Sequence, residues 1–504
     1  MGFDAEGRLL AIDVTQLARC GWSLDLSLAV ADRAMLHADN AYLIPHMRIT
    51  SHRLKTNTQS ATAFRGFGGP QGMIGMERIV EQVARHLGKD PVEVRRLNFY
   101  APPGAAKSGA GSGHRFGGAH SPQSPEPDNA TPYGMEVTDF ILHEMTEDLL
   151  RSSDFAARRE AIQAWNASNP ILKKGLAYAP VKFGISFTLT HLNQAGALVH
   201  IYRDGSVMLN HGGTEMGQGL HRKVTQVAAT AFGVPLTRVR ITATDTARVP
   251  NTSATAASSG ADLNGMATKA ACDTIRDRMA GHLAGLHQTT SDRVEFGDGM
   301  VSVGGERMTW DAAVESCYLG RVSLTSTGFY ATPDLEWDRI RGKGRPFFYF
   351  SYGCAVTEVA IDTLTGENRI LRVDILHDCG NSLNPALDIG QIEGGYVQGA
   401  GWLTTEELVW DDKGRLRTHA PSTYKIPAVS DRPAVFNVRL WDQPNRVSTI
   451  YNSKAVGEPP LMLGISAFLA LQDACAACGP NWPDLHAPAT PERVLAAVHE
   501  ARGA

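Results

Sequence analysis

The chain has 504 residues, of which 43% are hydrophobic and 20% charged, a composition typical of a globular protein with more than one domain. A formal net charge of -4 gives too weak a field to favour nucleic acid or an anionic membrane, so a small-molecule partner is expected. No apolar stretch of about 18 residues is free of polar interruption, and no basic stretch followed by an apolar run opens the chain. We therefore expect a cytoplasmic protein that binds neither nucleic acid nor membrane.

The cysteines are scattered, which favours reduced thiols over a disulfide framework. Cys475 and Cys478 have the spacing of metal ligands, but they lie near the end of an apolar helical stretch and have no second pair. Core thiols are therefore favoured there over a metal or redox site. No run of cysteines suits an iron–sulfur cluster, so electrons from any redox reaction must pass to another polypeptide.

The first hundred residues predict a hairpin and two helices. Residues 2–14 are typical of a hairpin whose first strand is nearly missing. Apolar residues at helical spacing predict a helix over 71–87, which Gly88 ends. Asp90 and Pro91 then predict the N-cap and first position of a second helix.

A segment without periodicity, residues 101–134, divides the chain. It is dominated by Gly, Pro, Ser, Ala and His, which predicts a linker or a surface insertion. Beyond it, Asp204 and Gly205 separate two short strand patterns and predict a two-residue hairpin turn. A glycine-rich turn at 212–219 comes next and leads into a helix with one apolar face.

The last third of the chain predicts further strands and one long helix. Strands are expected at 352–361 and 371–375, and an apolar helix begins near Pro460. Because strands and helices are mixed without regular alternation, the pattern indicates the α+β class.

Four loops carry residues suited to binding or catalysis, and each also has a plain structural explanation. The turn GGTEMGQG (212–219) offers backbone N–H groups to an anionic ligand, but a tight turn explains it equally well, and it matches neither common nucleotide-binding motif. The loop TAFRGFGGPQ (62–71) sets an arginine between two aromatics, or simply forms a corner. The loop SATAASSG (253–260) is made wholly of small residues, which suits backbone close to a ligand or the start of a helix. In KAVGEPPL (454–461) a carboxylate precedes two prolines, where it could also cap a helix.

Taken together and in this order, the four loops resemble the molybdenum-binding subunit of the xanthine dehydrogenase and aldehyde oxidase family, in its C-terminal part. The resemblance runs from about residue 1 to the C-terminus and weakens at 101–134 and around 285–320. Further phrases that carry it are ADRAMLHADN (31–40), FGISFT (183–188), LNQAGA (192–197), SLNPA (382–386), DIGQIEG (388–394) and TYKIP (423–427).

The resemblance implies a molybdopterin-cofactor-binding domain of two α+β subdomains. Residues 1–100 would be the C-terminal half of the first subdomain, 101–134 a linker or insertion, and 135–504 the second subdomain. In the family, half of the first subdomain lies upstream of the point where this chain starts. A fragment, a split-gene product or a mis-started frame is therefore expected, with the upstream half of the subunit as a partner.

The resemblance also implies where the molybdenum and its pterin bind. Arg65 and Ala257 would lie around the metal, which takes its sulfur ligands from the cofactor and needs no side-chain ligand. A 2Fe-2S cluster and FAD are expected on partner polypeptides in a hetero-oligomer, and not on this chain. The residues expected to bind the cofactor are Phe64, Gly217, Gln218, Ala257, Gln391 and Lys454.

In the resembled family the catalytic base corresponds to Glu458, which takes a proton from the attacking, water-derived oxygen. Arg33 and Arg65 would stabilise the charge that develops on a purine ring. Relatives that oxidise aldehydes usually lack an arginine at the position of Arg33, so xanthine or hypoxanthine is the favoured substrate, in purine catabolism. The residues expected to bind it are Arg33, Phe67, Phe187, Thr188 and Ala256, the two phenylalanines holding the flat ring.

Two alternatives stay open. One is a related molybdenum hydroxylase that acts on an aldehyde or on another nitrogen heterocycle. The other is a catalytically silent fragment that keeps the fold and turns nothing over.

Overall fold

The structure, a computed structural model, describes residues 1–104, 129–248 and 252–503. Its helices are α1 (Ser27–Leu36), α2 (Gly69–Leu87), α3 (Pro91–Leu97), α4 (Leu142–Ser152), α5 (Phe155–Ser168), α6 (Leu220–Phe232), α7 (Gly260–Leu286), α8 (Trp310–Leu319), α9 (Pro385–Thr404), α10 (Pro459–Met462), α11 (Ile465–Ala476) and α12 (Pro491–Arg502). Its strands are β1 (Gly2–Phe3), β2 (Leu9–Gly21), β3 (His46–Lys55), β4 (Leu172–Ile185), β5 (Gln194–Ile201), β6 (Val207–His211), β7 (Val239–Ile241), β8 (Val294–Gly297), β9 (Met300–Val303), β10 (Glu306–Thr309), β11 (Thr325–Ala331), β12 (Glu336–Asp338), β13 (Lys343–Arg345), β14 (Tyr349–Asp362), β15 (Asn368–His377) and β16 (Val435–Leu440). The predicted α+β class is confirmed.

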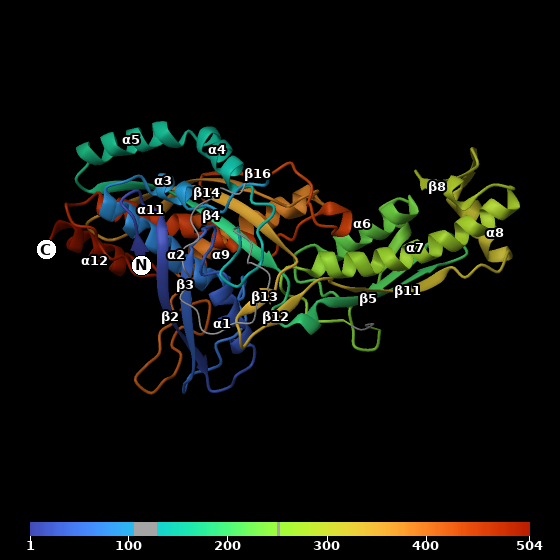
Figure 1. The fold of residues 1–504 in the computed structure, drawn as a ribbon, viewed down its shortest axis with the longest axis horizontal. Helices are drawn as coiled ribbons and strands as arrows, with labels where there is room; N and C mark the ends of the chain where they lie inside the picture. The colour runs from blue at the N-terminus through green and yellow to red at the C-terminus, as the bar shows by residue number, and fades with distance from the viewer. Residues whose placement is uncertain (105–128, 249–251, 504) are drawn as a thin grey trace, which may run out of the picture.

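Two mixed sheets organise the chain. The first has the strand order β16-β15-β14-β4, and α11 packs on β4 and β14. The second has the order β11-β5-β6-β7, and α7 packs on β5 and β11. In Figure 1 this second sheet, with α6, α7 and α8, forms a lobe that extends from a larger body, and both termini lie at the far end of that body. The two parts have separate hydrophobic cores, one built around α11 and the other around α7.

The local predictions for the first half of the chain are confirmed, except for the length of one turn. The short β1 pairs antiparallel with the start of β2. Helix α2 ends at Gly88, whose φ of 65° lies in the left-handed region that glycine adopts freely. The carboxylate of Asp90 accepts a hydrogen bond from the Val92 N–H and so caps α3. Strands β5 and β6 form the predicted hairpin, but its loop has three residues, 203–205, rather than the predicted two: the N–H of Tyr202 bonds to the carbonyl of Ser206 at 2.8 Å, and Gly205 is left-handed with a φ of 77°.

The predicted long helix from Pro460 differs in the structure, where it is divided into α10 and α11. At the division the N–H of Gly464 bonds to the carbonyl of Leu461, three residues back, at 3.1 Å. Helix α9 packs closely at this division, since a Cβ on Gly464 would lie 2.5 Å from the backbone nitrogen of Ala400. Residues Pro459–Ala476 are long and apolar enough to cross a membrane, but 89% of this window is buried inside the protein, as in a core helix.

Most of the predicted linker, residues 105–128 of 101–134, lies outside the described residues. Its two ends meet on the fold, since the side chain of Asn129 accepts from the N–H of Ala101 at 2.9 Å. A core cluster joins residues from both sides of the segment, including Tyr42 and Phe140. The division of the chain into subdomains at this segment stays a prediction.

A buried ion pair joins the turn that follows α1 to β4. The ammonium of Lys182 lies 3.1 Å from Asp39 Oδ2, and both side chains are 1% exposed. Tyr100 donates a second hydrogen bond to the same oxygen at 2.6 Å. Burial raises the pKa of Asp39 and lowers that of Lys182, while each charge opposes the shift of the other. Either charge left alone would be costly to bury.

We predict that Lys182→Met lowers the free energy of unfolding by about 3–5 kcal/mol, because it leaves the Asp39 carboxylate without its cation. Urea unfolding measures this change. The matched control is Lys269→Met, which removes the exposed pair of Lys269 with Asp273 within α7 and should cost only about 0.3–0.5 kcal/mol. Equal losses in the two variants would contradict the prediction.

Candidate functional site

A cavity of about 390 Å³ lies where the lobe meets the larger body. Its walls come from five segments far apart in the sequence, within residues 63–67, 216–223, 255–261, 383–391 and 453–458. Four of these segments contain or adjoin the loops identified in the sequence, and the fifth is the start of α9. The volume falls within the range of roughly 300–1,000 Å³ typical of small-molecule sites. No histidine or cysteine is among the described residues that line it.

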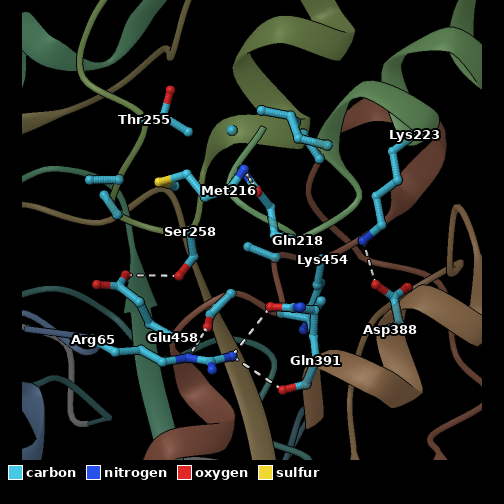
Figure 2. Close-up of a pocket in the computed structure, with 18 of the residues that line it drawn as sticks. Arg65, Met216, Gln218, Lys223, Thr255, Ser258, Asp388, Gln391, Lys454 and Glu458 are labelled. Carbon is cyan, nitrogen blue, oxygen red and sulfur yellow. Dashed lines mark hydrogen bonds and ion pairs between the residues drawn. The ribbon is translucent and has the colours of Figure 1, made fainter. Parts of the chain in front are cut away.

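Glu458 places a buried carboxylate on the cavity wall. It is the residue before α10, and its side chain is only 9% exposed. Its Oε1 accepts from the backbone N–H of Gly66 at 3.2 Å, and its Oε2 accepts from the Ser258 hydroxyl at 2.8 Å. Figure 2 shows the bond to Ser258 beside the cavity. Because the helix starts with Pro459 and Pro460, the backbone that carries the carboxylate is conformationally restricted.

Arg65 links three segments at the cavity floor. Its Nε donates to the carbonyl of Gly457 at 2.6 Å. Its Nη2 donates to the backbone carbonyl of Gln391 at 3.1 Å and lies 3.4 Å from that residue's side-chain oxygen (Figure 2). Burial lowers the pKa of Arg65, and the negative charge of Glu458 opposes that shift. The guanidinium therefore holds the Glu458 loop to the first turns of α9.

Arg33 lies on α1 and is almost completely buried, with 1% of the residue exposed. Its Nη2 donates to the carbonyls of Gly184 and Ser186, both at 2.8 Å, and its Nε has no hydrogen-bond partner. The guanidinium lies over the rings of Phe183 and Phe347. Burial lowers the pKa of Arg33, and the charge of Glu458 again opposes the shift. The negative charge of Glu458 thus acts on both arginines.

The small-residue loop brings strained backbone to the cavity. Ala257 and Ser258 have φ values of 56° and 61°, in the left-handed region that residues other than glycine seldom occupy. Such conformations cost about 1–3 kcal/mol each and persist where the surrounding structure enforces them, as at binding sites. Here the strained turn leads directly into α7 and points the Ser258 hydroxyl at Glu458.

The glycine-rich turn is closed by its own side chains. The Glu215 carboxylate accepts from the N–H groups of Gly217 and Gly219, both at 2.9 Å, and of His221 at 3.0 Å. Burial opposes ionisation, but these three bonds lower the pKa of Glu215. The Gln218 side chain bonds to the turn at Met216 and Thr214. These amides are thus already paired, so the tight-turn interpretation describes them better than an open anion site.

Two lysines line the cavity, and both are paired. The Lys454 ammonium donates to Asp139, to Asp378 and to a backbone carbonyl, which accounts for all three of its protons. Burial alone would lower the pKa of Lys454, but these two carboxylates raise it overall. Lys223 pairs with Asp388, as Figure 2 shows.

The structure brings most of the expected site residues to one cavity. Arg33, Phe187, Thr188 and Gly217 are not among its lining residues, although Arg33 is coupled to it through the charge of Glu458. Thr188, two residues after Ser186 in the sequence, is buried, and its hydroxyl has no hydrogen-bond partner. The expected residues that do line the cavity are Phe64, Arg65, Phe67, Gln218, Ala256, Ala257, Gln391, Lys454 and Glu458.

Other lining residues were not singled out from the sequence. Ser258 follows Ala257 directly, so its place in a loop of small residues is the signal that could have identified it. Lys223 stands in the first turn of α6, one turn after the glycine-rich sequence. Its partner Asp388 is 165 residues away, and no local pattern connects the two.

Comparison with known proteins relates this arrangement to a family. Residues 1–99 and 148–433 each match a molybdopterin cofactor-binding domain. Xanthine dehydrogenase/oxidase of Felis catus is 44% identical over 503 residues, which cover 98% of this chain and 34% of that protein. Xanthine dehydrogenase 1 of Arabidopsis thaliana is 42% identical over 512 residues, covering 99% of this chain and 34% of that protein. The chain therefore spans about a third of the length of these relatives.

The fold itself has solved counterparts. Quinoline 2-oxidoreductase from Pseudomonas putida 86 superposes with a TM-score of 0.81 at 24% sequence identity, covering 99% of this chain and 61% of that chain. At this level of identity the likeness concerns the fold alone. The match over residues 148–433 by itself takes in more than half of the chain, and the resemblance identified from the four loops is confirmed. The chain belongs to the molybdopterin cofactor-binding domain family and is a relative of the xanthine dehydrogenases.

Proposed function

We propose that the chain binds molybdopterin in the cavity beside Glu458 and forms part of an enzyme that hydroxylates xanthine or hypoxanthine with oxygen from water. The observation that carries the proposal is the buried Glu458 carboxylate, fixed on the wall of this cavity by two hydrogen bonds and coupled through its charge to two arginines. The names of the relatives that are 42–44% identical support a purine substrate.

The cavity residues suit an organic cofactor that brings its own metal ligands. The walls offer the Gln391 side chain, the remaining N–H of the Gln218 amide and small residues at Ala256 and Ala257, so polar edges of a pterin can be bound while backbone approaches closely. We assign Phe64 to the rim, where its ring is partly exposed. When bound, molybdopterin supplies the molybdenum that accepts the two electrons removed from the substrate.

Glu458 acts as the general base in this proposal. Its two oxygens already accept one hydrogen bond each, from Gly66 and Ser258, so the carboxylate is held in one orientation while it keeps capacity to accept a proton. A base positioned in this way contributes roughly 10²–10⁴ in rate.

Arg33 and Arg65 provide positive charge that is coupled to the charge of Glu458. Charge that builds up on the purine during oxygen attack is stabilised by cations that are already in place and poorly hydrated. Phe67 lies on the cavity wall and is proposed to hold the flat ring together with Phe187 and Thr188, which are not among the lining residues. The electrons then pass to iron–sulfur and flavin centres on partner polypeptides of a cytoplasmic assembly.

A second candidate is the hydroxylation of another nitrogen heterocycle; quinoline 2-oxidoreductase from Pseudomonas putida 86 shares the fold of this chain. An aldehyde substrate and a silent fragment are the remaining alternatives. Turnover of a panel of purines, quinolines and aldehydes, measured beside molybdenum content, separates all of them: molybdenum without turnover of any substrate would identify the silent form.

We predict that Glu458→Gln abolishes xanthine oxidation by the assembled enzyme, with a loss of at least about 10²-fold in kcat, because the amide cannot take up the proton. Molybdenum per chain should stay unchanged, since the amide keeps the size of the carboxylate. A steady-state assay and metal analysis on the same preparation measure both quantities. Turnover close to that of the wild type would exclude Glu458 as the base.

We predict that Arg33→Met costs more activity on xanthine than Phe67→Leu does. Loss of one charged donor at a developing anion costs about 10²–10³ in rate, whereas an aromatic contact contributes only about 0.5–1.5 kcal/mol. An aldehyde substrate is the internal control, because damage to folding would lower both activities together. If Arg33→Met lowers xanthine and aldehyde turnover equally, Arg33 has a structural role.

A further inference from the structure

A buried tyrosine and a buried aspartate lie behind the loop that carries Glu458. Tyr349, at the start of β14, donates its hydroxyl proton to Asp262 Oδ2 at 2.6 Å. The same hydroxyl oxygen accepts the backbone N–H of Ala455 at 2.8 Å. Asp262 belongs to the first turn of α7, and Ala455 precedes Glu458 by three residues. All three residues are buried.

These contacts close a ring with the Glu458 carboxylate. From Glu458 the chain runs back to Ala455, crosses through the Tyr349 hydroxyl to Asp262, and returns along the α7 loop to Ser258. The Ser258 hydroxyl then donates to Glu458. The small-residue loop and the Glu458 loop are therefore joined at two points, and the base lies at one of them.

Both of the joined loops contain strained backbone, so the junction through Tyr349 has a conformation to hold in place. Ala257 and Ser258 are left-handed in one loop, and Tyr451 and Asn452, with φ values of 49° and 59°, are left-handed in the other. Residues other than glycine keep this conformation only where surrounding contacts enforce it. Ala455 and Asp262 each follow one of these strained pairs in the sequence. Both bond to the hydroxyl of Tyr349, which belongs to β14.

The two partners together determine which way the tyrosine hydroxyl points. The backbone N–H of Ala455 can only donate, so the Tyr349 oxygen accepts there and the hydroxyl donates its hydrogen bond to Asp262 Oδ2. Burial raises the pKa of Asp262 to about 7, against the hydrogen bond from Tyr349 and the charge of Lys223. Lys223 on α6, Tyr349 on β14 and Tyr330 on β11 are the groups whose charges or protons act on it.

We propose that Tyr349 and Asp262 are positioning residues for Glu458: together they hold its loop against the Ser258 loop and thereby set the direction of the base toward the cavity. This inference rests on the proposed role of Glu458. Neither residue lines the cavity, so both act through Ala455 and Ser258 rather than on a ligand.

The test compares Tyr349→Phe with the wild type in the assembled enzyme. The variant keeps the ring and removes only the hydroxyl. We expect kcat for xanthine to fall about 10- to 100-fold through misplacement of the base, while KM and molybdenum per chain stay unchanged. Hydrogen exchange followed by mass spectrometry should show faster exchange in the peptide that contains Ala455, even in unloaded protein.

Two further variants separate positioning from general stability. Asp262→Asn keeps an acceptor for the hydroxyl and should retain most of the wild-type kcat. Asp262→Leu removes the acceptor and should lower kcat as Tyr349→Phe does. Tyr178→Phe is the matched control, because it removes another buried hydroxyl, bonded to Thr146, at a place remote from the cavity. It should leave kcat and the exchange of the Ala455 peptide unchanged.

Unchanged kcat in Tyr349→Phe, with or without faster exchange, would overturn the proposal. An equal fall of kcat in Tyr178→Phe would also overturn it, because the effect would then be one of stability. If instead Glu458→Gln stays active, the proposed function fails, and this result is distinct from either outcome of the tyrosine variant.

Discussion

Glu458 supplies one buried negative charge that acts on two guanidinium groups, the buried one of Arg33 and the partly buried one of Arg65. An isolated charge of either sign would be expensive to bury, so the three groups have to be folded in together. They come from α1, from the turn before α2 and from the residue before α10, which are distant in the sequence. The position of the base is therefore a property of the whole tertiary structure rather than of the loop that carries it.

The packing of α9 against α10 provides the rigid support for this charge. A Cβ on Gly399 would lie 1.9 Å from the carbonyl oxygen of Leu461, so the two helices can approach this closely only through glycine. The contact sets the start of α9, with Gln391, beside the start of α10, with Glu458, and Arg65 bonds to both segments. Small residues thus bring the helices together, and charged residues then complete the site.

Features that depend on neighbours in the sequence could be predicted from it. The end of α2 at Gly88, the Asp90 cap and the turn at Gly205 each follow from the chemistry of one or two residues. The four loops were recognised through their composition and order. The division between α10 and α11 was not predicted; it lies where α9, a helix from elsewhere in the chain, packs against Gly464. The pairs of Lys223 with Asp388 and of Tyr349 with Asp262 span 165 and 87 residues, so no sequence period reveals them.

The cavity beside Glu458 is proposed to hold the molybdenum of a bound pterin. The most direct measurement is X-ray diffraction from crystals of the assembled enzyme, with data collected at the molybdenum absorption edge. The anomalous difference map should show one strong peak for this chain, inside the cavity and next to the Glu458 carboxylate, with Arg65, Gln218 and Ala257 around it. A molybdenum peak elsewhere in the chain, with the cavity empty, would contradict the account.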